Sequence, residues 1–228
     1  MRPPSKTLLA LDTSTRTIGL ALYNGVQVLH AATWNTQDYH TVELAPAVAE
    51  ALKRTSVGPD GLNALAVALG PGSFTGLRVG MALAKGIALM RHLPIIGVPT
   101  LDALAVAQPQ RDIPLAAVLR AGRGRLAVGW YKMENETWKA FGKLEIHTPQ
   151  ELAAQIHTPT LVCGELTEAE RDLLAGEGPN VILASPAHSV RHPAFLAELA
   201  WRRWQAGRID DPATLAPIYL HHNDPIPG

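Results

Sequence analysis

A cluster of small polar residues directly follows the first apolar run of the chain. In "LLALDTST", Asp12 ends the run and Thr13, Ser14 and Thr15 follow it. Such a turn can offer backbone N–H groups and hydroxyls to a phosphate, while the aspartate holds a metal ion through water. The same residues also suit a polar hairpin turn in which Asp12 and Ser14 satisfy nearby backbone groups, and the pattern by itself favours that structural interpretation.

A second candidate is the glycine-rich stretch "LGPGSFTG". Gly70 and Gly72 permit unusual backbone angles around Pro71, and Ser73 or Thr75 can cap a following helix whose N-terminus would attract an anion. The stretch is not a Walker motif, because no Gly-Lys-Ser/Thr ends it. A phosphate loop and a structural strand-to-helix turn both remain open.

Two further groups of residues have chemical potential. His40 and Glu43 lie three residues apart on a predicted helix and could form half of a metal site, but nothing nearby completes it, so a role at the helix start is favoured. Arg120, Arg123 and Arg125 surround two glycines and could bind an anion or form a solvated loop. The sequence shows no Ser-His-Asp or Cys-His arrangement.

These residues sit on a regular order of predicted elements. Three strands over 6–14, 17–25 and 26–33 form an antiparallel meander, in which Asn24-Gly25 marks a hairpin turn. A helix over 39–54, a strand over 62–69, a helix from about 73 to 91 and a strand over 93–98 follow. A meander followed by alternating helix and strand is the layout of a ribonuclease-H-like half.

A break in the apolar pattern at residues 108–112 divides the chain into two predicted subdomains, 1–108 and 109–228. The second begins with strands over 113–119 and 125–133 and then alternates weakly. We expect helices over 148–156 and 166–176, strands over 160–164 and 181–183, and a last helix over 192–207 that can pack back on the N-terminal half.

Composition limits the class of protein. The chain has 228 residues, of which 47% are hydrophobic and 18% charged, so it can build a sizeable core. It contains neither an apolar run of about 18 residues nor a signal-peptide pattern, and its lone Cys163 has no partner for an internal disulfide. We therefore expect a soluble, cytoplasmic protein with no membrane association. Because its net charge is zero, any tight RNA binding would need a partner.

Four stretches together carry a family resemblance: "LALDTST", "HTVELAP", "ALGPGSFTGLRVGMALAKGIA" and "IIGVPTLDALA". They resemble the TsaB family of tRNA threonylcarbamoyladenosine biosynthesis proteins, densely over residues 7–107 and thinly afterwards. The resemblance implies an actin-like, sugar-kinase-like ATPase fold of two related halves. It also implies a non-catalytic scaffold subunit that binds the paralogue TsaD and supports the ATPase TsaE. TsaD would add the threonylcarbamoyl group to the adenosine next to the anticodon, so tRNA contact would be indirect.

Departures from the catalytic pattern indicate what this chain lacks. Thr100 and Leu104 stand where the paralogue carries metal-binding histidines, and Arg120-Ala121-Gly122 stands where an acidic motif is usual, so even the remnant carboxylates of the second half are expected to be missing. We therefore predict no catalytic residue, metal or cofactor. The predicted vestigial nucleotide loop comprises Asp12, Thr13, Ser14, Thr15, Gly70, Gly72 and Ser73. The alternative is an actin-fold ATPase or phosphotransferase that uses Asp12 and its turn, whereas a metallopeptidase fails on ligand count.

The helix over 73–90 is apolar on nearly all sides. At about 100° per residue, we expect Gly76, Gly80, Leu83 and Ile87 to face a sheet. The opposite face should bind TsaD, or a second copy of the chain when alone, with the 38–54 helix beside it. The predicted partner-binding residues are Phe74, Arg78, Met81, Ala82, Lys85, Leu89, His40 and Glu43.

Overall fold

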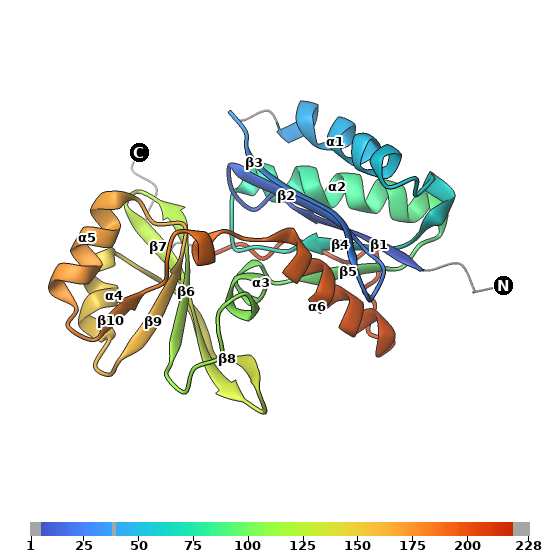
Figure 1. Cartoon of the computed structure of the whole chain (residues 1–228). Helices are drawn as coiled ribbons and strands as arrows, with labels where there is room; N and C mark the ends of the chain where they lie inside the picture. Colours follow the sequence, from blue (N-terminus) through green and yellow to red (C-terminus); the bar gives the residue numbers. More distant parts are fainter. Residues whose placement is uncertain (1–5, 38–39, 221–228) are drawn as a thin grey trace.

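The computed structural model describes residues 6–37 and 40–220, which form two lobes, each built on a five-stranded sheet (Figure 1). The first sheet has the order β3-β2-β1-β4-β5. Its strands are β1 (Thr7–Asp12), β2 (Thr17–Tyr23), β3 (Val28–Asn35), β4 (Leu62–Ala68) and β5 (Ile95–Val98). β1 to β3 are antiparallel, whereas β4 and β5 run parallel to β1. The predicted antiparallel meander followed by alternating helices and strands is confirmed.

Helices cover both faces of the first sheet. α1 (His40–Arg54) and α2 (Phe74–Arg91) lie on one face, and α6 (Pro193–Gln205) lies on the other (Figure 1). Because successive strand residues point to opposite faces, Leu9 and Leu11 pack beneath α1 and α2, while Leu8 and Ala10 pack against α6. Every residue of β1 is buried, which explains its continuous apolar pattern.

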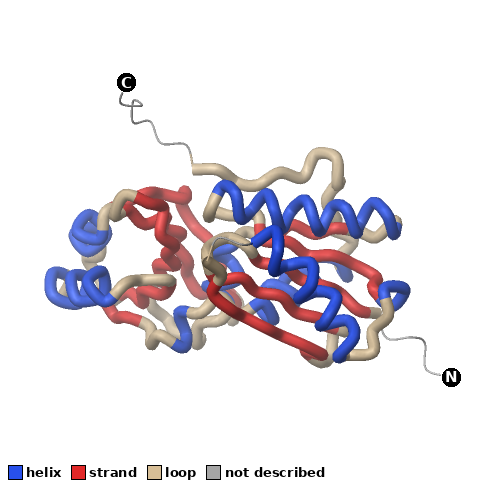
Figure 2. Tube along the Cα trace, turned by 90° about the horizontal axis from the view of Figure 1, so that it is seen from above, coloured by secondary structure: helices blue, strands red, loops and turns tan. Residues whose placement is uncertain are grey.

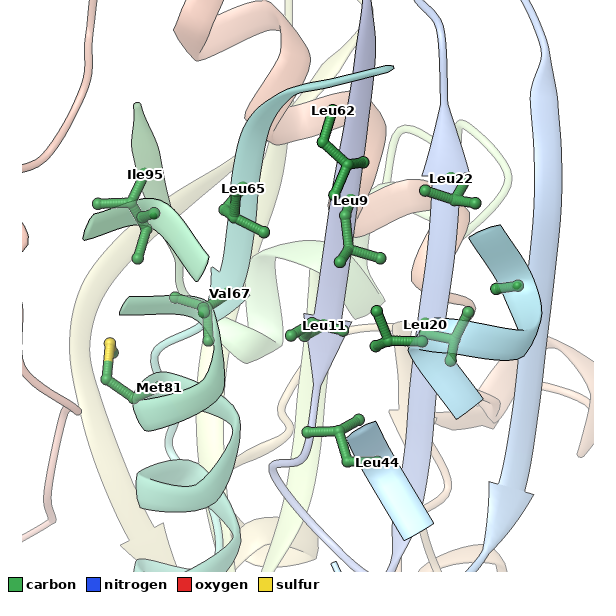
Figure 3. Close-up of a cluster of buried hydrophobic side chains, with 14 of the residues drawn as sticks. Leu9, Leu11, Leu20, Leu22, Leu44, Leu62, Leu65, Val67, Met81 and Ile95 are labelled. Carbon is green, nitrogen blue, oxygen red and sulfur yellow. The ribbon is translucent and has the colours of Figure 1, made fainter. Parts of the chain in front are cut away.

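The packing of α2 differs from the prediction in which residues face the sheet. Met81 is 5% exposed and lies in the core with Leu65 and Ile95 (Figure 3). The prediction that Met81 belongs to an exposed partner face is therefore wrong. The small residues Ala84 and Ala88 face the sheet beside it, whereas the predicted sheet-facing residues Leu83 and Ile87 are only half-buried.

The second lobe has the strand order β10-β9-β6-β7-β8. Its strands are β6 (Leu115–Gly122), β7 (Arg125–Glu134), β8 (Thr137–His147), β9 (Thr160–Gly164) and β10 (Val181–Leu183). α4 (Pro149–Gln155) and α5 (Glu168–Glu177) cover its outer face, and α3 (Thr100–Val106) lies between the lobes (Figure 1). The 3₁₀ turns η1 (Pro59–Gly61) and η2 (Ala187–Ser189) complete the elements. α3 and β8 are elements that the sequence did not predict.

The chain returns to the first lobe after the second sheet is complete. α6 packs on β1 and β2, and the stretch after α6 follows the β5 edge, where the Asp210 amide donates to the Ile95 carbonyl at 2.9 Å. Figure 2 shows this stretch as a loop that runs back towards the start of α2. The predicted division between residues 108 and 109 stays a prediction. Among the described residues, no helix combines the length and hydropathy that crossing a membrane requires.

The burial of Met81 generates a stability prediction. Met81→Arg should lower the free energy of unfolding by about 3–5 kcal/mol, because it places an unpaired charge in the core of the first lobe. Chemical denaturation followed by circular dichroism measures the change. Arginine at the adjacent exposed Ala82 should change the free energy by less than about 0.5 kcal/mol. Equal effects at the two positions would contradict this orientation of α2.

Candidate functional site: the cleft between the lobes

The turn between β1 and β2 holds a buried carboxylate. Asp12 is 3% exposed, and its Oδ1 accepts a hydrogen bond from the Ser14 amide at 2.9 Å. Its Oδ2 accepts a hydrogen bond from Arg191 Nε at 2.8 Å. The local contact matches the hairpin-turn interpretation, but the arginine comes from the segment between η2 and α6 and was not anticipated.

Arg191 has several partners around its guanidinium. Its side chain is 2% exposed and also donates to Thr15 Oγ1 at 3.0 Å, to the Thr17 carbonyl at 2.8 Å and to the Glu165 carboxylate. Burial alone would lower the pKa of Arg191, but the charges of Asp12 and Glu165 outweigh burial and raise it. The cation beside Asp12 is therefore a permanently charged side chain of the protein.

Glu165 corrects the expectation that the second half contributes no carboxylate. It follows Gly164, the last residue of β9, and accepts a hydrogen bond from Thr15 Oγ1 at 3.2 Å. Gly164 has a φ of 144°, and a Cβ there would lie 1.9 Å from the Val118 carbonyl oxygen, so only glycine fits. A Gly-Glu pair directly after a buried strand was the available sequence signal.

Internal hydrogen bonds engage several backbone amides in and just after the glycine-rich loop. The Ser73 amide donates to the Ser14 carbonyl at 2.6 Å, and Ser73 Oγ caps α2 by accepting from the Gly76 amide at 3.2 Å. The Gly70 amide donates to Thr100 Oγ1 at 3.0 Å, and Thr100 Oγ1 also contacts Ser14 Oγ at 2.7 Å. A phosphate bound here would have to compete with these contacts.

Three glycines allow the start of α2 to touch the β1–β2 turn. A Cβ on Gly72 would lie 2.3 Å from the Ser14 carbonyl oxygen. One on Gly76 would lie 2.3 Å from the Thr13 carbonyl oxygen, and one on Gly80 would lie 2.2 Å from Thr13 Oγ1. The predicted loop residues are thus brought together, and the glycines are required by close approach of protein to protein.

A cleft of about 720 Å³ lies beside this network, between the lobes. Arg120 on β6 lines this cleft. Its side chain is 58% exposed, and its Nε lies 3.6 Å from Glu170 Oε1. Arg123 lies at the β6–β7 turn with a φ of 52°. Neither Arg123 nor Arg125 lines the cleft, so the predicted arginine cluster does not converge on it as a whole. The cleft is lined by Ser14, Thr15, Arg16, His40, Pro71, Gly72, Ser73, Phe74, Leu119, Arg120, Ala121, Gly122, Ala127, Glu165, Tyr219 and Leu220.

The predicted residues on α1 have partners inside the first lobe. His40 is 6% exposed, and its Nε2 lies 2.9 Å from the Thr15 carbonyl oxygen. Glu43 accepts hydrogen bonds from Trp34 Nε1 at 2.7 Å and from Thr36 Oγ1 at 3.0 Å, which ties α1 to the end of β3. Both residues therefore have structural roles in the first lobe. Their role as contacts to a partner protein stays a prediction.

The positions compared with the catalytic paralogue are buried. Thr100 and Leu104 are both 0% exposed, Thr100 in the hydrogen bonds above and Leu104 in the core beneath the second sheet. Within residues 6–37 and 40–220, no group of three His, Cys, Asp or Glu side chains could hold a metal ion. Burial also raises the pKa of the Cys163 thiol, which disfavours its reactive thiolate form.

Comparison with solved structures defines the class of protein. The structure of YeaZ from Pseudomonas aeruginosa superposes with a TM-score of 0.77 at 24% identity, covering 94% of this chain and all of that chain. ROK hexokinase from Thermus thermophilus superposes with a TM-score of 0.52 at 11% identity, covering 88% of this chain and all of the hexokinase chain. The two-lobed architecture is that of the actin-like, sugar-kinase-like ATPase fold, as the family resemblance implied.

Sequence comparison identifies the family. The family model described as tRNA N6-adenosine threonylcarbamoyltransferase (TsaD) matches residues 32–192. The tRNA threonylcarbamoyladenosine biosynthesis protein TsaB of Bacillus subtilis is 30% identical, covering 94% of this chain and 93% of the relative. TsaB of Escherichia coli is 28% identical, covering 95% of each chain. The chain belongs to the TsaB family.

The glycine contacts predict opposite effects of one substitution at two positions of α2. Gly76→Ala should destabilise the protein by about 1–3 kcal/mol, because the new methyl group would meet the Thr13 carbonyl oxygen. Gly86→Ala should stabilise it by about 0.5–1 kcal/mol, because a Cβ there meets nothing within 4 Å and alanine favours the helix. Thermal and urea unfolding measure both changes. Equal stabilisation at both sites would show that the turn does not restrict Gly76.

Proposed function

We propose that the chain is a non-catalytic scaffold subunit of a complex that modifies tRNA. In that complex a TsaD-like paralogue adds a threonylcarbamoyl group to N6 of the adenosine next to the anticodon, in tRNAs that read codons beginning with A. A TsaE-like ATPase is the third component, and this chain reaches tRNA only through its partners. Family membership supports the pathway, and the surface between α1 and α2 supports the scaffold role.

The observation that carries the scaffold proposal is an apolar groove between α1 and α2. It has a volume of about 520 Å³ and is lined by residues of both helices, among them the exposed side chains of Ala45 and Ala82. Phe74 is 53% exposed and Leu89, further along α2, is 61% exposed. An exposed apolar surface on two adjacent helices is typical of a protein interface. The groove residues are His40, Thr41, Leu44, Ala45, Phe74, Thr75, Arg78, Val79, Ala82 and Leu83.

The charges along α2 support selection of a partner. Arg78 is held at the start of α2, where its guanidinium lies 3.6 Å from the Phe74 ring centroid and its Nε donates to Tyr219 Oη at 3.0 Å. Lys85 is half-buried two turns further along the helix. An apolar centre with two cations along the same helix favours a partner of complementary charge.

The groove predicts a variant that folds and fails to assemble. Ala82→Arg should reduce affinity for the TsaD-like partner at least tenfold, because it places a long charged side chain in the groove without disturbing the core. Titration calorimetry with the partner from the same organism measures affinity, and sedimentation of the isolated chain shows whether a homodimer is also lost.

Ala175→Arg on α5 provides the matched control, because Ala175 is also an exposed helical alanine but lies on the second lobe. It should leave partner affinity within twofold of the unmodified chain. If Ala82→Arg binds normally while remaining folded, the partner surface lies elsewhere. Normal tRNA modification by a reconstituted mixture that omits this chain would contradict the scaffold role itself.

The alternative function, an ATPase or phosphotransferase, is tested by nucleotide binding. Millimolar ATP with Mg²⁺ should raise the melting temperature by less than about 1 °C, because Arg191 already neutralises Asp12 and the amides of Gly70 and Ser73 have internal partners. A saturable increase of several degrees, accompanied by phosphate release from the isolated chain, would favour the alternative.

A further inference from the structure

The Arg191 network connects the two lobes across the open side of the cleft. Arg191 precedes α6, and its contacts with Asp12 and the Thr17 carbonyl lie within the first lobe. Its contact with Glu165 reaches the end of β9 in the second lobe. One guanidinium therefore bonds simultaneously to groups that belong to different lobes.

A second set of contacts joins the lobes on the side of α3. Tyr131 Oη on β7 donates to Asp102 Oδ1 on α3 at 2.8 Å, and Trp138 Nε1 on β8 donates to the Gln108 carbonyl at 3.3 Å. Asp102 and Gln108 lie in the connection between β5 and β6, which contains α3, so these contacts can hold the lobes at a hinge. The Arg191 contact lies at the cleft, where a rotation about that hinge would separate the partners.

Separation of the lobes would be unfavourable for Arg191. Its guanidinium is fully withdrawn from water, and a buried charge is stable only while its hydrogen-bonding partners stay in place. Glu165 is 25% exposed and could regain water if the lobes moved apart, but Arg191 would lose one of its two carboxylates. Closure around a bound ligand is common in two-lobed proteins, and here a side chain supplies the bridging charge.

We propose that Arg191 is a built-in clasp that holds the two lobes closed in the absence of any ligand. Its guanidinium bonds to Asp12 on one lobe and to Glu165 on the other. The clasp goes beyond the scaffold function and does not depend on it.

Glu165→Gln tests the clasp because it removes the charge of the inter-lobe contact and leaves the Asp12–Arg191 pair intact. Spin labels on Ala49→Cys of α1 and Ala175→Cys of α5 report the distance between the lobes, since both positions are exposed. The native Cys163 is buried and should not be labelled. We expect one narrow distance distribution for the unmodified protein and a broader distribution, shifted to longer distances, for Glu165→Gln.

Glu168→Gln is the matched control, because Glu168 is an exposed glutamate close to Glu165 on the same lobe. It should leave the distribution unchanged. Arg191→Met should broaden the distribution further and lower the melting temperature by about 6–12 °C, while Glu165→Gln alone should lower it less. If Arg191→Met does not fold, the distance distribution of Glu165→Gln alone decides whether the proposal holds.

A double variant shows whether Arg191 and Glu165 hold the lobes together through their mutual contact or affect the distance between the lobes independently. If Arg191 and Glu165 act together, adding Glu165→Gln to Arg191→Met should broaden the distribution no further than Arg191→Met alone. Additive broadening, or a narrow unmodified-type distribution in a folded Glu165→Gln protein, would overturn the proposal. The readout is a distance between lobes, so a failure of the scaffold proposal would leave this result unaffected.

Discussion

The ion pair between Asp12 and Arg191 joins residues 179 positions apart and lies where the first strand meets the cleft. Both side chains are removed from water, so each requires the other to remain in place. The pair fixes the segment that leads into α6, and Pro193 at the start of α6 then lies against Gly19 of β2, where a Cβ would be 3.2 Å from the proline ring. One buried pair thus determines how the end of the chain covers the second face of the first sheet.

The contact between the β1–β2 turn and α2 complements this pair on the other side of the turn. Gly72 and Gly76 bring the start of α2 against the backbone of Thr13 and Ser14, and Thr13 Oγ1 donates to the Gly76 carbonyl at 2.7 Å. In a nucleotide-binding turn, hydroxyls and amides of this kind would face a phosphate. Here several of them bond to one another, and the close approach of the two segments explains why glycine is needed at these positions.

The first sheet was largely predictable because its signals are local. Asn24-Gly25 marks the hairpin, and the buried strands are continuous apolar runs. β8 was missed because most of its residues are exposed and Gly142, at a φ of 72°, lies where its pairing with β7 shifts and interrupts the alternation. The phase of α2 was misjudged because large Leu83 and Ile87 were assigned to the sheet, whereas Ala84 and Ala88 face it.

The clustering of Arg191 with Asp12 and Glu165 could not be predicted, because no spacing relates residues that meet only through the tertiary fold. As a consequence, the two sides of the first lobe differ in how their surface groups are paired. On the cleft side, the Arg191 network and the contact between α2 and the β1–β2 turn satisfy several polar groups with the chain's own residues. Away from the cleft, apolar side chains of α1 and α2 such as Val42 and Leu89 remain exposed. Exposed apolar surface costs free energy unless another chain covers it, whereas satisfied polar groups gain little from a ligand. These energetics are consistent with the proposed scaffold function.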